Sequence, residues 1–216
     1  MRKLFWTGKA SFFSKLAINT AGILGWLVGN SRDVEGMKAR VRDGYNGRYS
    51  EHVYGYGKLG GKHYSIISDR LLSRVDCRGR VVADIGCGMG VTTVEALKKG
   101  ASNVVSIDAS RYMLSQCRNN VAEKCLPNAH VTYCEGDAET LPFPDSCFDV
   151  VLSSMVVGML PNQLKALSEM ARVLRPHGML AIATHGPEHY REAIDAAIRV
   201  MSLRHFVFDR LEFWKR

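Results

Sequence analysis

Long apolar runs and repeated segments are both missing from this sequence of 216 residues. The longest apolar run, Leu16 to Gly29, has fourteen residues, whereas a helix that crosses a bilayer needs about 20. The basic residues before this run resemble the start of a signal peptide, but no small-x-small cleavage pattern follows it. Because 46% of the residues are apolar, the chain is predicted to form one globular domain with an N-terminal appendage.

Paired cysteines are also missing. The six cysteines include no C-x-x-C motif and no spacing typical of metal ligands. A chain of this length needs no disulfides for its core, so reduced thiols, a cytoplasmic location and no metal are expected. Cys87 lies among glycines, where it is either a nucleophile or, the interpretation we favour, a residue small enough to fit.

Negative charge is scarce in the N-terminal part of the chain. Residues 1–80 contain 15 lysines and arginines against 6 acidic residues, whereas residues 81–216 contain 14 against 15. A basic segment suits an anionic membrane surface, a nucleic acid or an acidic substrate, and it is equally typical of a solvated arm without a partner. The composition does not distinguish among these four possibilities.

An amphipathic helix is predicted within residues 13–29, because the apolar residues there fall on one helical stripe. Packing against its own domain or a partner is the simpler interpretation, and peripheral membrane contact is the alternative. The chain then divides into three predicted regions. Residues 1–32 form the basic and apolar helix, residues 33–79 a cap or substrate segment, and residues 80–216 the main domain.

From Arg80 onward, short apolar runs rich in β-branched residues alternate with segments of helical periodicity. Such runs are typical of strands buried on both faces of a parallel sheet. The predicted strands are Val81–Ile85, Val104–Ile107, Val131–Cys134, Phe148–Ser153 and Met179–Thr184, and the predicted helices are Val91–Lys99, Tyr112–Cys125 and Gln163–Leu174. Ser110 is placed to cap the second of these helices. Right-handed crossovers then give an α/β fold with a doubly wound, mostly parallel, Rossmann-like sheet of about five strands.

Three glycines at alternate positions follow the first predicted strand. Gly86, Gly88 and Gly90 remove the Cβ atoms that would keep a ligand away from the backbone, and they permit positive φ. A dinucleotide fingerprint needs G-x-G-x-x-G, but Val91 stands where its third glycine would fall. The loop is therefore predicted to hold a nucleoside with a short zwitterionic tail. This spacing argues against a nicotinamide oxidoreductase.

Acidic residues lie at the ends of three predicted strands. Asp84 can attract an ammonium group, Asp108 can accept both hydroxyls of a ribose, and Asp137 can accept from the exocyclic amine of adenine. Ala138 offers a backbone N–H to the same ring, and Ser153 would line the cleft after the fourth strand. Taken singly, the three acids could cap a turn, cap a helix or form an Asx-turn. Their joint occurrence behind the glycine loop favours a ligand site.

Residues 80–185 resemble a class I S-adenosylmethionine-dependent methyltransferase of the small-molecule, type 11-like group. The matching motifs are DIGCGMG (84–90), SIDAS (106–110), the adenine loop and fourth strand GDAETLPFPDSCFDVVLSS (136–154), and LRPHGMLAIAT (174–184). The resemblance implies methyl transfer from S-adenosyl-L-methionine to a small-molecule acceptor by in-line displacement. The cofactor-binding residues that it implies are Asp84, Gly86, Cys87, Gly88, Gly90, Asp108, Ala109, Asp137, Ala138 and Ser153.

The catalytic residues are left open. Many members of that family carry a histidine or a glutamate after the fourth strand, where this chain has Gly158 and Met159. His185 and four tyrosines of the N-terminal region are the remaining candidates for a proton acceptor or a wall of the cleft. The tyrosines are Tyr45, Tyr49, Tyr54 and Tyr56.

The segment after residue 184 is shorter than the family leads one to expect, because an antiparallel strand pair usually follows there. We expect that pair to be missing, and the edge of the fifth strand to be covered by the N-terminal helix, a partner or a second copy of the chain. The alternative function is a truncated S-adenosylmethionine-binding module with impaired or no activity, acting with a partner. A nucleic-acid acceptor is disfavoured, because no D/N-P-P-[YF] signature follows the fourth strand.

Overall fold

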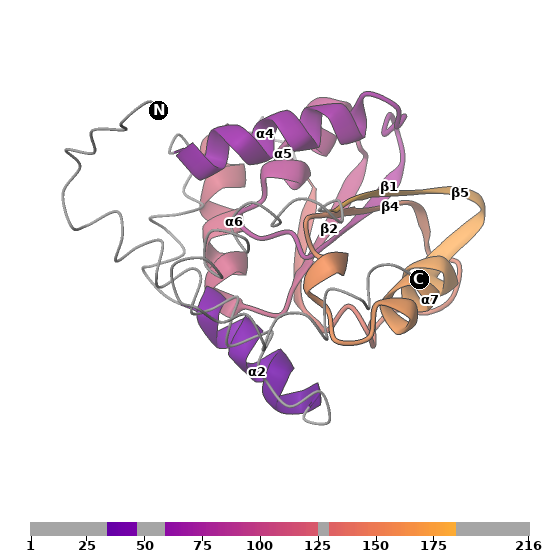
Figure 1. The fold of residues 1–216 in the computed structure, drawn as a ribbon. Coiled ribbons are helices and arrows are strands. Elements are labelled where there is room, and N and C mark those ends of the chain that lie inside the picture. Colours follow the sequence, from indigo (N-terminus) through magenta and orange to yellow (C-terminus); the bar gives the residue numbers. More distant parts are fainter. Residues whose placement is uncertain (1–33, 47–58, 125–129, 185–216) are drawn as a thin grey trace, which may run out of the picture.

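The structure is a computed structural model that describes residues 34–46, 59–124 and 130–184. At its centre lies a five-stranded sheet of order β3-β2-β1-β4-β5, in which every pair of neighbours is parallel (Figure 1). The strands are β1 (Val81–Ile85), β2 (Asn103–Asp108), β3 (Val131–Glu135), β4 (Phe148–Ser154) and β5 (Leu174–Ala183). The helices are α2 (Val34–Tyr45), α4 (Leu59–Leu72), α5 (Val91–Lys98), α6 (Arg111–Lys124), the 3-10 turn η1 (Val157–Met159) and α7 (Gln163–Val173). The predicted α/β fold with a doubly wound parallel sheet is confirmed.

Most helix and strand bounds agree with the prediction to within one residue, but the predicted start of β5 was wrong. The strand was predicted to begin at Met179, whereas it begins at Leu174. Leu174 already pairs with Phe148, and the regular ladder resumes where Met179 pairs with Val150. Between them the chain bulges outward through His177, which has φ 64. Because the bulge contains Pro176 and Gly178, the sequence looks like a turn there.

The sheet separates two apolar cores, as its alternating side chains require. Ala83 and Ile85 of β1 face one core, to which α7 contributes Met170 and Val173. Val82 faces the other core together with other buried residues, among them Leu72, Val75, Ala96 and Leu152. Figure 1 shows α4, α5 and α6 on one side of the sheet and α7 on the other. Both faces are thus covered, and ligands in such sheets bind at the carboxyl ends of the strands.

The segment before β1 contributes two helices to the described structure. Helix α4 packs on α5, and a hydrogen bond of 2.8 Å joins the hydroxyls of Ser68 and Thr92. Leu72 of α4 is 1% exposed and lies in the core. Helix α2 was not predicted from the sequence.

Two predictions fall on residues that lie outside the described ones. They are the amphipathic helix within residues 13–29 and the missing strand pair beyond residue 184. In the described part of the chain, β5 is an edge of the sheet. None of the described helices is both long enough and apolar enough to span a membrane.

Candidate functional site

A cavity of about 610 Å³ opens at the carboxyl ends of β1, β2, β3 and β4. Its walls come from the loops that follow these four strands and from helices α2 and α4. This volume is within the range of about 300–1,000 Å³ that is usual for small-molecule sites. The site residues predicted from the sequence divide into those that line the cavity and those that lie beneath its wall. The lining residues of the predicted set are Gly86, Cys87, Gly88, Asp108, Ala109, Asp137 and Ala138.

The glycine loop connects β1 to α5 by a tight turn. The backbone N–H groups of Gly86 and Cys87 both donate to the carbonyl of Ile107, at 2.8 and 2.9 Å. Gly86 has φ 71, and a Cβ added there would lie 2.2 Å from Cγ2 of Val156. Gly90 has φ 82, and its added Cβ would lie 2.5 Å from Sγ of Cys117. Both positions therefore require glycine for packing as well as for backbone conformation.

Gly88 differs from its two neighbours in the loop. Its φ is 52, yet a Cβ added there would meet nothing within 4 Å. Because Gly88 lines the cavity, that space is open to a ligand. The glycine thus presents bare backbone to whatever the cavity holds.

Asp108, at the end of β2, is held by backbone donors. Its Oδ2 accepts from the N–H of Gly88 at 2.8 Å, and its Oδ1 accepts from the N–H of Ser110 at 2.9 Å. Burial raises the pKa of Asp108 above its ordinary value, although the N–H bonds of Ser110 and Gly88 oppose this rise. Each carboxylate oxygen has two lone pairs, so both oxygens can accept a further hydrogen bond from the cavity.

Asp84 lies beneath the glycine loop rather than in the cavity wall. It is 1% exposed, and its Oδ2 accepts from the hydroxyl of Thr93 at 2.7 Å. Its Oδ1 is buried without a hydrogen-bond partner. Burial raises the pKa of Asp84 to about 7, and the Thr93 bond only partly offsets this. Two other predicted residues, Gly90 and Ser153, also lie outside the cavity lining, and Ser153 is fully buried.

Asp137 is the second residue of the loop of residues 136–145 after β3. Its Oδ1 accepts from the N–H of Glu139 at 2.9 Å, which is the Asx-turn considered from the sequence. Its Oδ2 accepts from Nζ of Lys38 at 2.6 Å, and the same ammonium lies 2.9 Å from Oε2 of Glu139. Neither Lys38 nor Glu139 was predicted from the sequence. Lys38 comes from α2, 99 residues before Asp137 in the chain.

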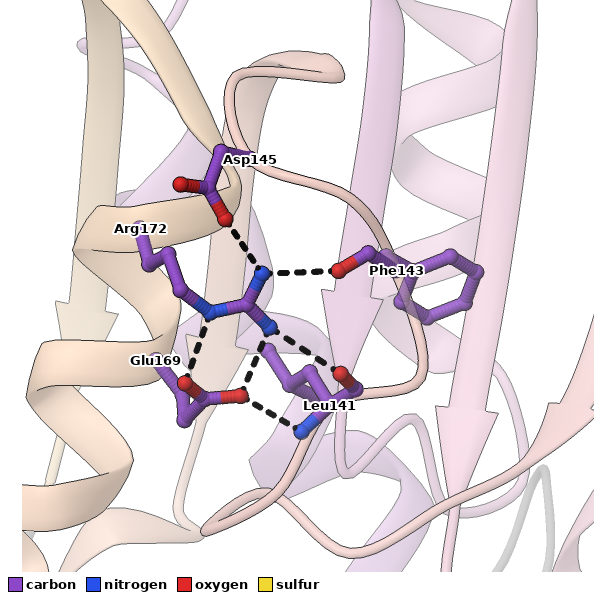
Figure 2. Close-up of polar contacts among 5 residues, drawn as sticks. All are labelled: Leu141, Phe143, Asp145, Glu169 and Arg172. Carbon is purple, nitrogen blue, oxygen red and sulfur yellow. Dashed lines mark hydrogen bonds and ion pairs between the residues drawn. The ribbon is translucent and has the colours of Figure 1, made fainter.

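The other end of the 136–145 loop is held by Arg172 of α7 (Figure 2). The guanidinium donates to the carbonyls of Leu141 and Phe143, at 3.0 and 2.8 Å. It also pairs with Glu169 at 2.7 Å and with Asp145 at 2.8 Å. These two acids, Glu169 more than Asp145, raise the pKa of Arg172. The loop is therefore fixed at both ends by a cation.

The end of β4 supplies an irregular backbone to the cavity. Met155 adopts φ 63, a conformation that a residue with a side chain rarely takes. Its N–H donates to the carbonyl of Ala183 at 2.7 Å, which holds the turn against the end of β5. Met155 lines the cavity together with Ser154 and Val156. Backbone of this kind is often found at functional sites.

No proton acceptor was predicted after β4. In the described residues, the cavity wall at this point is mainly apolar. Met159 lines the cavity, and the hydroxyl of Tyr45 donates to its Sδ at 3.3 Å. Of the candidates considered, Tyr45 thus lines the cavity, while Tyr49, Tyr54, Tyr56 and His185 lie outside the described residues.

Cys87 packs against Cys117 in a small apolar cluster. Burial raises the pKa of the Cys87 thiol well above its ordinary value. A thiol in this state is a poor nucleophile, which agrees with a space-filling role. In the described part of the chain, five cysteines are free and no group of three metal-ligating side chains occurs.

Helix α2 was not predicted as a helix, although Tyr45 at its end was named as a candidate for a wall of the cleft. Lys38, Val41 and Tyr45 share one face of it and line the cavity. A second anchor lies at its end, where the hydroxyl of Ser110 donates to Oδ1 of Asn46 at 2.6 Å. The spacing of these residues was visible in the sequence. The signal is weak, because α2 also contains two glycines and several charged residues.

The comparisons with known proteins agree with this geometry. A family described as "Methyltransferase domain" matches residues 83–182. The chain contains a methyltransferase domain. The malonyl-[acyl-carrier protein] O-methyltransferase of Pectobacterium atrosepticum is 35% identical over 117 residues, which are 54% of this chain and 43% of that protein. The phosphatidylethanolamine N-methyltransferase of Cereibacter sphaeroides is 34% identical over 116 residues, which are 54% of this chain and 56% of that protein.

A solved structure supports the same assignment. The YcgJ protein of Bacillus subtilis has a TM-score of 0.51 and 31% identity, over 57% of this chain and 51% of that one. The matches therefore span about half the length of these relatives. They establish the family of the domain, and they leave the acceptor unspecified.

Proposed function

We propose that the cavity at the strand ends binds S-adenosyl-L-methionine and that the chain transfers its methyl group to a small-molecule acceptor. The observation that carries the proposal is the pairing of Gly88 with Asp108. The bare backbone of Gly88 faces the cavity, and the Asp108 carboxylate lies 2.8 Å from its N–H. A zwitterionic tail and a ribose, two of the polar parts of this nucleoside, match these two features.

The residues have separate roles in this proposal. Gly86, Cys87 and Gly88 would hold the methionine end, and Asp108 with Ala109 would hold the ribose. Asp137 and Ala138 would hold the adenine. Asp84, Gly90 and Ser153 would act from beneath the wall, since their side chains or backbone do not line the cavity. A contribution of Asp84 to a bound ammonium group is then electrostatic rather than a contact.

When bound, the sulfonium of this cofactor supplies a methyl carbon that is already activated for displacement. The chain has to hold an acceptor in line with that carbon, and orientation of this kind can contribute about 7–11 kcal/mol to a barrier. The strand-end loops provide the fixed frame that such orientation needs. A strong base is then unnecessary for an acceptor that is ionised or carries a free electron pair.

The acceptor is proposed to be small and either apolar or aromatic. The cavity wall near the end of β4 contains Met155, Val156, Met159 and Leu160, and Tyr64 of α4 also lines the cavity. Side chains of this type exclude water and favour an apolar partner. The two relatives from Pectobacterium atrosepticum and Cereibacter sphaeroides are named for different acceptor atoms, oxygen and nitrogen, so they do not point to one methylated atom.

Calorimetric titration with S-adenosylmethionine, S-adenosylhomocysteine and NAD tests the cofactor. If the chain binds both sulfur nucleosides and does not bind NAD, the proposal is supported. If it binds NAD and neither sulfur nucleoside, the proposal is contradicted. Transfer of a labelled methyl group into a panel of small metabolites then tests turnover. Cofactor binding without transfer to any acceptor would favour the alternative of an inactive binding module.

A further inference from the structure

The ion pairs of Lys38 link helix α2 to the start of the 136–145 loop. Its Nζ lies 2.6 Å from Oδ2 of Asp137 and 2.9 Å from Oε2 of Glu139. The Lys38 side chain is 20% exposed and that of Glu139 is 2% exposed. Lys38 and Glu139 are therefore largely enclosed, whereas the Asp137 side chain is 38% exposed. Lys38 and Asp137 both lie in the cavity wall.

Each carboxylate oxygen of Glu139 has its own hydrogen-bond partner. Oε1 of Glu139 accepts from the N–H of Asn162 at 2.8 Å, which leaves Oε2 for Lys38. Burial acts to lower the pKa of Lys38, but its hydrogen bonds to Asp137 and Glu139 outweigh that effect and raise the pKa. Lys38 is thus a charged donor that fixes the orientation of both carboxylates.

Helix α2 does not depend on this cluster alone. The Ser110 hydroxyl binds Oδ1 of Asn46 at 2.6 Å, and the Tyr45 hydroxyl binds Sδ of Met159 at 3.3 Å. These contacts attach α2 to the loop after β2 and to the turn after β4. Lys38 is therefore presented to Asp137 by a helix that is held at further points.

We propose that Lys38 is a positioning residue that makes the adenine subsite selective for a 6-amino purine, an inference that rests on the proposed function. An ionised carboxylate is an acceptor only. Held by Lys38, Asp137 accepts from a 6-amino group and repels the oxygen of a 6-oxo purine. Without Lys38, the N–H of Glu139 still holds Oδ1, but Oδ2 loses its charged partner, so the carboxylate can turn away from the 6-position and discriminates less between the two groups.

Titration with two ligands measures this selectivity. The ligands are S-adenosylhomocysteine and S-inosylhomocysteine, which differ in the 6-amino and 6-oxo groups. We expect the wild-type chain to prefer the amino ligand by at least about tenfold, because a site built to accept from an amine rejects a group that cannot donate. Lys38→Met should reduce this preference by about fivefold or more, and Lys38→Arg should restore most of it.

Two comparison variants separate positioning from a general structural role. Arg172→Met loosens the other end of the same loop, so it should weaken both ligands by a similar factor and leave their ratio unchanged. Lys165→Met makes the same chemical change on an exposed part of α7, and it should change neither affinity. If Lys38→Met fails to melt cooperatively, Lys38→Gln, which is polar but removes the charge and shortens the side chain, takes its place and should also reduce the ratio.

The inference is overturned if Lys38→Met keeps the wild-type ratio, or if it weakens both ligands equally, as Arg172→Met should. It is also overturned if the wild-type chain binds the two ligands alike, a result that leaves the proposed cofactor standing. A wild-type chain that binds neither ligand contradicts the proposed function itself.

Discussion

The strand-end loops and helix α2 line the same cavity, but they are encoded in different ways. The glycine loop and Asp108 are each marked in the sequence by a short motif that directly follows an apolar strand. The pairing of Lys38 with Asp137 joins residues that are 99 positions apart. A local motif is therefore enough to locate one wall of the site, whereas the wall that α2 contributes follows only from the complete fold. The variants below test each side of this comparison.

The largest effect is expected at Gly86, on the side of the local motif. Gly86→Ala places a Cβ 2.2 Å from Cγ2 of Val156 and forces φ 71 on an alanine. Overpacking and left-handed backbone together should lower the free energy of unfolding by about 2–5 kcal/mol. Urea denaturation measures this loss. Gly88→Ala, with no atom within 4 Å of its added Cβ, is the matched control and should be clearly more stable than Gly86→Ala. Equal stability of the two variants would contradict the packing argument.

A pH-dependent effect is expected at Asp84. Its pKa is about 7 in the folded chain against an ordinary value of 3.8, because the carboxyl is buried. Between these values the folded state binds more protons than the unfolded state, so Asp84 lowers the free energy of unfolding as pH rises from about 4 to about 7. Asp84→Asn removes this contribution. The free energy of unfolding of the variant, taken relative to that of the wild type, should therefore rise over that interval by at most about 4 kcal/mol.

Urea denaturation of both proteins from pH 4.5 to pH 8 checks this prediction. The constant offset from the amide substitution cancels when only the pH dependence of the difference is compared. Two profiles that run parallel over the whole interval would show that Asp84 does not titrate there.

The smallest effect is expected at Ser110, where the two regions meet. Its hydroxyl accepts from the N–H of Met113 at 3.1 Å as a helix cap and donates to Asn46 of the α2 segment. Ser110→Ala loses both bonds and should cost about 1 kcal/mol in the free energy of unfolding. Ser110→Asp keeps a cap acceptor but cannot donate to Asn46. Hydrogen exchange should show weaker protection of α2 amides in both variants, and unchanged protection would mean that α2 does not depend on this bond.

Most of the parallel sheet could be predicted from the sequence, since its strands are apolar runs and its helices have clear caps at Ser110 and Asn162. The start of β5 could not, because a proline and a glycine within a bulge look like a turn. In the site, Gly88, Asp108 and Asp137 were found at the cavity by their position after strands. Asp84 was predicted to attract an ammonium group; its side chain is buried, accepts from Thr93 and does not line the cavity. Lys38 was missed because nothing near it in the sequence marks its distant partner.

The most direct test of the account is the affinity of Asp108→Ala for S-adenosylhomocysteine, measured by calorimetric titration beside the wild-type chain. The wild type should bind at one site, and the variant should bind at least about tenfold more weakly, because two ribose hydroxyls lose a charged acceptor. Binding of equal strength by the two proteins would contradict the assignment of this cavity to an S-adenosyl nucleoside.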